Sequence, residues 1–229
     1  MNNILITGAG SGIGAATARL FHQRGWRVGL LDINEAPLAA LADFTGSQEG
    51  QLRLLFNCAG ILRIGYFEDI EMLEHARIMQ INVLGLLQMT HAAFPYLKAT
   101  PGAQVINMGS ASGLYGVPHF ASYSASKFAV RGLTEALDLE WQRHDIRVGD
   151  LMPPFVRTPM VSSQSFHTPI IDRLGVDLEA EDIAEAAWLQ AHDARVHRPV
   201  STQFTWLYRL GQITPAALTR LLMRWVSRP

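Results

Sequence analysis

Short apolar runs alternate with helical patterns along most of this chain. Residues 4–7, 26–32, 52–56, 104–108 and 146–152 read as strands, and residues 15–24, 70–98 and 122–143 read as helices, with Pro95 predicting a break near the end of the second helix. Strands that alternate with helices predict a parallel sheet covered by helices on both faces. The fold class is therefore α/β, and catalytic groups are expected beyond the carboxyl ends of the strands.

The first strand runs directly into a glycine-rich turn that opens a helix. The turn contains Gly8, Gly10, Ser11, Gly12, Ile13 and Gly14. Glycines let the backbone approach a pyrophosphate closely, and a helix N-terminus presents free N–H groups to the anion. The second strand ends at Asp32, eighteen residues after Gly14, where a carboxylate suits the ribose hydroxyls of NAD and repels the extra phosphate of NADP. We therefore expect a dinucleotide site with NAD as the cofactor.

A tyrosine and a lysine lie four residues apart in the last predicted helix. At this spacing Tyr123 and Lys127 share one helix face. A phenol ordinarily loses its proton near pH ~10, and a neighbouring ammonium favours the phenolate. The pair is expected to move a proton near neutral pH. The spacing alone also occurs in many helices by chance, so its weight comes from the other motifs.

Several ordered motifs together resemble the short-chain dehydrogenase/reductase family over most of the chain. Residues 7–14 look like the cofactor turn of the family, and Asn57-Cys58-Ala59-Gly60 looks like its Asn-Asn-Ala-Gly element. Ser110 lies thirteen residues before Tyr123, as the family's catalytic serine does, and residues 153–160 resemble the segment that closes over the nicotinamide. The resemblance implies one domain, residues 1–229, with a Rossmann-like doubly wound sheet and a substrate lid at residues 160–176.

The resemblance also implies roles for individual residues. Tyr123 would be the general acid/base, Lys127 would stabilise the phenolate and bind the nicotinamide ribose, and Ser110 would hydrogen-bond the substrate oxygen. Asn82 would hold a water that relays protons from Lys127 to solvent. Besides the turn and Asp32, the cofactor would contact Asn57, Ala59, Gly60, Tyr123, Lys127, Val156 and Thr158.

The chain departs from the family pattern in three places. Only twenty-five residues separate Asp32 from Asn57, about half the expected length, so the third strand and its helix are lacking or not shown. A real deletion and a segment omitted from the supplied chain both fit. Pro154 replaces a common glycine, which leaves the nicotinamide contacts to Val156 and Thr158. The usual final glycine-rich strand is not recognisable.

The C-terminal extension, residues 212–229, carries apolar residues at i, i+3, i+4 and i+7 spacing. Leu218, Leu221, Leu222 and Trp225 lie opposite Arg220 and Arg224. This pattern predicts an amphipathic helix. Such a helix packs on its own domain or on a subunit partner, or else lies on a membrane surface.

Composition excludes several classes of protein. With 229 residues and 48% hydrophobic content, the chain can bury a substantial core as one domain. A net charge of −1 gives no electrostatic case for nucleic acid. The single cysteine, Cys58, allows no internal disulfide, and the eight histidines show no metal-binding spacing. The early first strand leaves no room for a signal peptide, and no apolar run reaches the ~18 residues of a transmembrane helix, so we expect a cytoplasmic protein.

The sequence favours an NAD-dependent oxidoreductase that interconverts a secondary alcohol and a ketone. Apolar residues in the lid, such as Phe166 and Ile170, suggest a moderately apolar substrate, and His119 and His167 are candidates to touch it. By resemblance, residues 70–98 and 122–143 would pair into a homodimer or homotetramer. The alternative is a non-catalytic dinucleotide-binding regulatory or scaffold protein of the same fold, which the short 32–57 segment supports.

Overall fold

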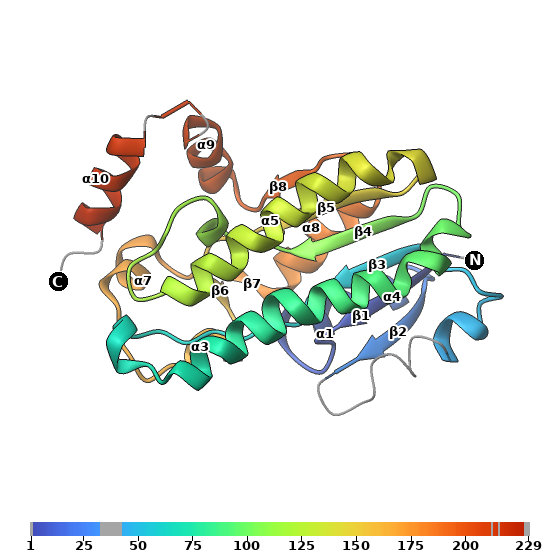
Figure 1. The fold of residues 1–229 in the computed structure, drawn as a ribbon, viewed down its shortest axis with the longest axis horizontal. Coiled ribbons are helices and arrows are strands. Elements are labelled where there is room, and N and C mark those ends of the chain that lie inside the picture. Colours follow the sequence, from blue (N-terminus) through green and yellow to red (C-terminus); the bar gives the residue numbers. More distant parts are fainter. Residues whose placement is uncertain (1, 33–42, 212, 215, 227–229) are drawn as a thin grey trace.

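The computed structural model describes residues 2–32, 43–211, 213–214 and 216–226, which build one parallel sheet with helices on both faces (Figure 1). The sheet has six strands in the order β2-β1-β3-β4-β5-β8. The strands are β1 (Asn3–Thr7), β2 (Arg27–Leu31), β3 (Leu54–Asn57), β4 (Gln104–Met108), β5 (Arg147–Met152) and β8 (His197–Pro199). A separate parallel pair joins β6 (Val156–Arg157) and β7 (Leu178–Glu179). The expected α/β, doubly wound architecture is confirmed.

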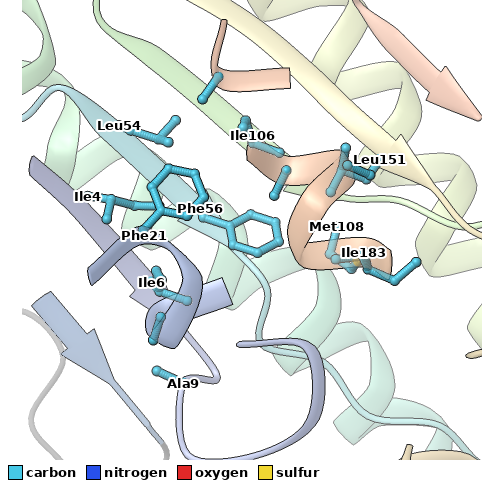
Figure 2. Close-up of a cluster of buried hydrophobic side chains, with 14 of the residues drawn as sticks. Ile4, Ile6, Ala9, Phe21, Leu54, Phe56, Ile106, Met108, Leu151 and Ile183 are labelled. Carbon is cyan, nitrogen blue, oxygen red and sulfur yellow. The ribbon is translucent and has the colours of Figure 1, made fainter. Parts of the chain in front are cut away.

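Alternating side chains along the strands supply a core to each face of the sheet. Ile4 and Ile6 of β1 point toward α1 and α8, where Figure 2 shows them with Phe21, Phe56 and Ile183. Leu5, between them, belongs to the opposite cluster beneath α4 and α5. The helices of these two layers are α1 (Gly12–Gln23) and α8 (Ala180–Ala191) on one face, and α4 (Leu86–Lys98) and α5 (Ala121–Trp141) on the other.

Shorter elements surround this framework. Helix α3 (Met72–Met79) continues through a π-helical turn, η2 (Gln80–Gly85), into α4. Three 3₁₀ turns are η1 (Phe67–Asp69), η3 (Ala111–Gly113) and η4 (Gln142–His144). The predicted lid contains α6 (Pro159–Ser162) and α7 (Pro169–Leu174), and α9 (Thr202–Gly211) and α10 (Ala216–Val226) end the described chain. The predicted C-terminal helix is thus present as α10.

The edge of the sheet is formed by β2, where the family's third strand would pair. Within the described residues β2 pairs only with β1, and residues 43–53 contain no strand. Phe44 instead packs onto the core beside Leu5, and its ring lies 2.9 Å from where a Cβ on Gly29 would be. Phe44 therefore covers part of the sheet face beside β2. Residues 33–42, including the Ile33 position, lie outside the described residues.

Two sequence predictions about secondary structure are wrong. The final strand exists: β8 pairs in parallel with β5, with Asp150 opposite His197. Its three residues, His197, Arg198 and Pro199, are not apolar and therefore gave no strand signal. The second is the break at Pro95, which lies inside the uninterrupted α4. Pro95 removes a single N–H donor near the helix end, and its own carbonyl still accepts from the Ala99 N–H at 3.1 Å.

Candidate active site

A cavity of about 560 Å³ opens at the carboxyl ends of the strands. This is where ligands bind in open parallel α/β sheets. Nearly all of the predicted site residues line it: Gly8, Ser11, Gly12, Ile13, Gly14, Asp32, Asn57, Ala59, Gly60, Ser110, Tyr123, Lys127, Val156 and Thr158. Gly10 and Asn82 do not line the cavity. Gly10 hydrogen-bonds Asp32, and Asn82 hydrogen-bonds Ile61, and both of these partners line it.

The turn after β1 requires glycine at two positions. Gly8 has φ +68°, and a Cβ there would lie 2.7 Å from the Ala59 Cα. A Cβ on Gly14 would lie 2.2 Å from the Gly8 carbonyl oxygen. Thr7 ties the same turn to the neighbouring strand, since its Oγ1 accepts from the N–H groups of Cys58 and Ala59 at 3.0 and 3.1 Å. The turn therefore packs backbone against backbone, which only glycine allows at these two positions.

Gly10 holds the acidic residue at the end of β2. Its N–H donates to Asp32 Oδ2 at 2.7 Å, and a Cβ on Gly10 would collide with that oxygen. The Asp32 carboxylate is thereby fixed at the cavity wall. A fixed negative charge at this place matches the position predicted for a ribose-binding acid.

Tyr123, Lys127 and Ser110 come together at the inner end of the cavity. Tyr123 lies in the first turn of α5, and Lys127 follows one turn later with its Nζ 5.4 Å from the centre of the phenol ring. Lys127 Nζ donates to the Met108 carbonyl at 2.8 Å, just before Ser110. The Ser110 side chain accepts from the Ser112 N–H at 3.1 Å, and its interaction with the Tyr123 phenol lowers the pKa of that phenol. The strand end and the helix start thus place a hydroxyl, a phenol and an ammonium in one pocket.

Burial shifts the acidity of this pair. Burial raises the pKa of Tyr123 to about 12, and the Ser110 hydrogen bond opposes this increase. Burial also lowers the pKa of Lys127 to about 8, while interactions with Cys58 and Asp150 favour its charged form. Burial is the largest influence on both side chains, and it disfavours both charged forms. In addition, the ammonium is hydrogen-bonded to a backbone carbonyl. The expectation that Lys127 favours the phenolate stays a prediction.

Asn82 is a buried anchor in the π-helical turn. Its Oδ1 accepts from the Ile61 N–H at 2.8 Å, and its Nδ2 donates to the Ile61 carbonyl at 3.0 Å and to Ser126 Oγ at 3.1 Å. Both side-chain donors are used, and Gly60 passes close by. The side chain therefore positions the segment after β3, and the predicted water relay stays a prediction.

Asn57 lines the cavity but directs its side chain into the protein. Its Nδ2 donates to Thr90 Oγ1 and to Asn107 Oδ1, both at 2.9 Å. Asn107 in turn donates to Thr134 Oγ1 at 3.0 Å. This buried amide chain links β3 and β4 to α4 and α5. A cofactor contact at Asn57 would therefore involve its backbone.

The closing segment after β5 crosses the glycine turn. Thr158 Cγ2 lies 3.6 Å from where a Cβ on Gly12 would be, and Val156 is buried beside it. Pro153, Pro154 and Phe155 also line the cavity. The segment therefore lies against the glycine turn and lines the cavity, and its closure over a nicotinamide stays a prediction.

The structure adds an apolar wall that sequence reasoning only partly found. Besides Ile170 of the lid, it comprises Leu62, Tyr115, Val117, Phe120 and Phe155. In the sequence, the aromatic residues Tyr115 and Phe120, between Ser110 and Tyr123, indicate this apolar wall. Phe166, in contrast, packs on His119 and Tyr66 and does not line the cavity.

Neither candidate lid histidine lines the cavity. His119 Nδ1 lies 2.9 Å from Thr168 Oγ1, so this residue fastens the lid to the loop before α5. His167 is 82% exposed and lies 2.8 Å from Asp172. The suggestion that either histidine touches substrate is therefore not supported by this structure, because their side chains contact the lid or solvent.

The described part of the chain lacks two further features. No group of three or more His, Cys, Asp or Glu side chains could hold a metal ion. No described helix is both long and apolar enough to cross a membrane.

Comparisons with known proteins agree with this geometry. A family model described as short chain dehydrogenase matches residues 2–53 and 40–168, and its two segments overlap in the shortened region. Cyclohexanol dehydrogenase of an Acinetobacter species is 31% identical over 223 residues, covering 83% of this chain and 88% of that protein. A 3-alpha-(or 20-beta)-hydroxysteroid dehydrogenase of Mycobacterium bovis is 38% identical over 131 residues, covering 57% of this chain and 50% of that protein.

Solved structures show the same fold. A 3-ketoacyl-(acyl-carrier-protein) reductase from Brucella melitensis complexed with NADH superposes with a TM-score of 0.74 at 26% identity, over 87% of this chain and 96% of that one. Thermoplasma acidophilum aldohexose dehydrogenase superposes with a TM-score of 0.73 at 23% identity, over 87% of this chain and 92% of that one. With most of its length matched in sequence and in fold, the chain belongs to the short-chain dehydrogenase/reductase family.

Proposed function

We propose that this oxidoreductase is NAD-dependent and interconverts a secondary alcohol and a ketone, with Tyr123 as the general acid/base. The observation that carries the proposal is the meeting of Tyr123, Ser110 and Lys127 in the cavity that also contains the glycine turn. A protein that only binds dinucleotide has no need of this trio. The names of the cyclohexanol and hydroxysteroid dehydrogenases point to the same reaction class.

The cavity fits a nicotinamide dinucleotide. Gly8, Gly12 and Gly14 line the cavity where α1 begins, and at Gly8 and Gly14 the close backbone packing leaves no space for a side chain. A pyrophosphate there would accept hydrogen bonds from the N-terminal N–H groups of α1. Asp32 would hold the adenine ribose, Lys127 the nicotinamide ribose, and Val156 and Thr158 the nicotinamide amide. The cavity wall between these proposed cofactor contacts is formed or supported by Gly10, Asn57, Ala59 and Gly60.

The protein's own residues would then control the proton. Hydride acceptance and donation are the chemistry that NAD supplies when bound. Tyr123 takes the alcohol proton when it is ionised and returns it to the ketone oxygen in the reverse direction. Ser110 donates a hydrogen bond to the same oxygen and holds it near the phenol. Lys127 would favour the phenolate with its ammonium closer to the phenol oxygen than its present position on the Met108 carbonyl, and Asn82 holds the segment after β3.

The apolar wall favours an uncharged, largely hydrocarbon substrate. Leu62, Val117, Phe120 and Ile170 are buried around the space in front of Tyr123, and none carries a charge. Apolar walls with a few polar groups are typical of sites for small hydrophobic ligands. We therefore expect cyclic or aliphatic secondary alcohols to be better substrates than sugars or hydroxy acids.

A screen of such alcohols with NAD, followed by absorbance of the reduced cofactor, tests the proposed function. Turnover of apolar alcohols above sugars and hydroxy acids is expected. Absence of turnover for every alcohol and ketone, by protein that still binds NADH, would contradict the proposal and favour the binding-protein alternative.

We expect tighter binding of NADH than of NADPH, by about tenfold or more, because one unfavourable charge contact of ~1.4 kcal/mol has that effect. The variant Asp32→Asn should reduce the difference in affinity between NADH and NADPH. The asparagine can still accept the Gly10 N–H, so the variant removes charge and keeps the turn. Fluorescence titration of both reduced cofactors measures the ratio. Asp69→Asn, outside the cavity, is the matched control. An unchanged ratio in Asp32→Asn, or tighter NADPH binding by the unmodified protein, would refute the argument.

A homodimer or homotetramer is part of the proposal. Leu84 and Leu87, at the junction of η2 and α4, and Phe128 and Leu139 of α5 are about 40–70% exposed. Exposed apolar residues on adjacent helices are typical of subunit contacts. Light scattering that shows only monomer at all concentrations would contradict the proposed homodimer or homotetramer.

A further inference from the structure

The last two helices present an outward apolar surface. Trp206, Leu207 and Leu210 of α9, Ile213 in the following turn, and Leu218 and Leu221 of α10 form it, and we call these six residues the C-terminal apolar face. Each of them is 47% to 80% exposed. They occupy the end of the molecule where α9 and α10 project from the body (Figure 1). Exposed apolar residues gathered on neighbouring elements mark interaction sites.

Both helices are anchored to the domain by their other side. Phe204 of α9 is buried against Ala111 and Met152, with Tyr208 packed beside it. Met223 of α10 packs on the lid cluster that includes Ile170. The residues of the C-terminal apolar face stay exposed although the helices are docked, so they are not needed to dock them. The anchoring sides hold the face in a fixed orientation.

The charged residues on α9 and α10 themselves all have one sign. Residues 194–229 contain six arginines and no lysine, aspartate or glutamate, so the preceding 193 residues carry the 20 acidic and 13 remaining basic groups. The C-terminal segment is therefore +6, and the rest of the chain is −7. Arg209, Arg220 and Arg224 are exposed, and none forms an ion pair with a described residue. The Arg209 guanidinium lies 5.7 Å from the centre of the Trp206 ring.

We infer that the C-terminal apolar face docks this protein on an anionic lipid bilayer surface. Leucine and tryptophan enter the boundary between headgroups and acyl chains, and arginines at its edge pair with lipid phosphates. A second copy of the chain is a poorer partner for the same face, since a two-fold contact brings each patch against itself and opposes like charges. The inference concerns binding and does not depend on the proposed reaction.

Flotation of the full chain with lipid vesicles tests the inference. The protein should float with vesicles of phosphatidylcholine and phosphatidylglycerol, and about tenfold less with phosphatidylcholine alone or at high salt. The triple variant Leu207→Gln, Leu210→Gln, Leu221→Gln should lose flotation by a similar factor, as should Arg209→Gln, Arg220→Gln, Arg224→Gln. Leu73→Gln with Leu189→Gln, at 59% and 56% exposure elsewhere on the surface, should float like the unmodified protein.

Circular dichroism and the thermal midpoint should be unchanged in all variants, because the substituted side chains are exposed. Failure of the unmodified protein to float with anionic vesicles overturns the inference, as does equal flotation of the triple variants. If the leucine variant instead turns a dimer into a monomer in light scattering while vesicles bind neither form, a second copy covers the face and the inference is wrong.

Discussion

Replacing Tyr123 with phenylalanine is expected to lower kcat for secondary-alcohol oxidation by about 10²- to 10⁴-fold, the usual contribution of a positioned general acid/base. The change removes only the phenol oxygen, and both Tyr123 and Ser110 line the cavity. The ring and its contact with Lys127 remain. Initial-rate measurements with the best alcohol of the screen give the ratio of kcat values.

Two controls separate loss of chemistry from loss of structure. NADH titration by fluorescence should give a similar Kd for Tyr123→Phe and the unmodified protein, because the glycine turn and Asp32 are untouched. Tyr96→Phe, on α4 outside the cavity, removes the same atom type and should keep full turnover. Unchanged kcat in Tyr123→Phe would show that another group moves the proton.

The acidity of the pair decides how this catalysis works near neutral pH. A phenol pKa of about 12 leaves almost no phenolate at pH 7. Ionisation then requires positive charge closer to the phenol oxygen than in this structure, where Lys127 Nζ is hydrogen-bonded to Met108. Oxidation rates are accordingly expected to rise with pH, since more of the tyrosine is then ionised.

The parts of the site that follow from local backbone geometry could be predicted from sequence. Gly8 is required by its φ of +68° and Gly14 by its contact with the Gly8 carbonyl, both within one strand–turn–helix unit, so their pattern identifies the turn. The four-residue spacing of Tyr123 and Lys127 fixes their common face because it lies within one helix. Such features depend on neighbours close in the chain, which the sequence displays directly.

The parts that depend on distant contacts could not be predicted. The pKa of Tyr123 reflects burial by the lid and by the segment after β3, which a one-helix argument omits. His119 lies near Tyr123 in sequence, yet its bond to Thr168, 49 residues away, turns it to the lid. The strand β8 exists because it pairs with β5, although its own residues resemble a loop.

That pairing places a buried ion pair behind the active site. Asp150 of β5 is fully buried, and its Oδ1 lies 3.0 Å from His197 Nδ1. His197 Nε2 lies 3.0 Å from Glu135, which also accepts from Arg131 at 2.9 Å. Burial raises the pKa of Asp150. For His197 burial acts to lower the pKa, but the hydrogen bond and charge of Asp150 raise it above its ordinary value of 6.5.

Replacing His197 with alanine is expected to lower the free energy of unfolding by about 3–5 kcal/mol, because an unpaired charge then remains in the interior. Urea unfolding at neutral pH, followed by circular dichroism, measures the change. The double variant His197→Ala, Asp150→Asn should recover part of the loss, since its interior holds no charge. No recovery in the double variant would mean that packing, and not the charge pair, makes His197 important.

The same pair gives the stability a defined pH dependence. A histidine whose pKa is raised by folding contributes stability that is fully present below the pKa of the unfolded chain, ~6.5, and is lost as pH rises through the folded-state value. The free energy of unfolding of the unmodified protein should therefore fall as pH rises above neutrality. In His197→Ala this decrease should be absent, and an identical decrease in both proteins would assign it to another group.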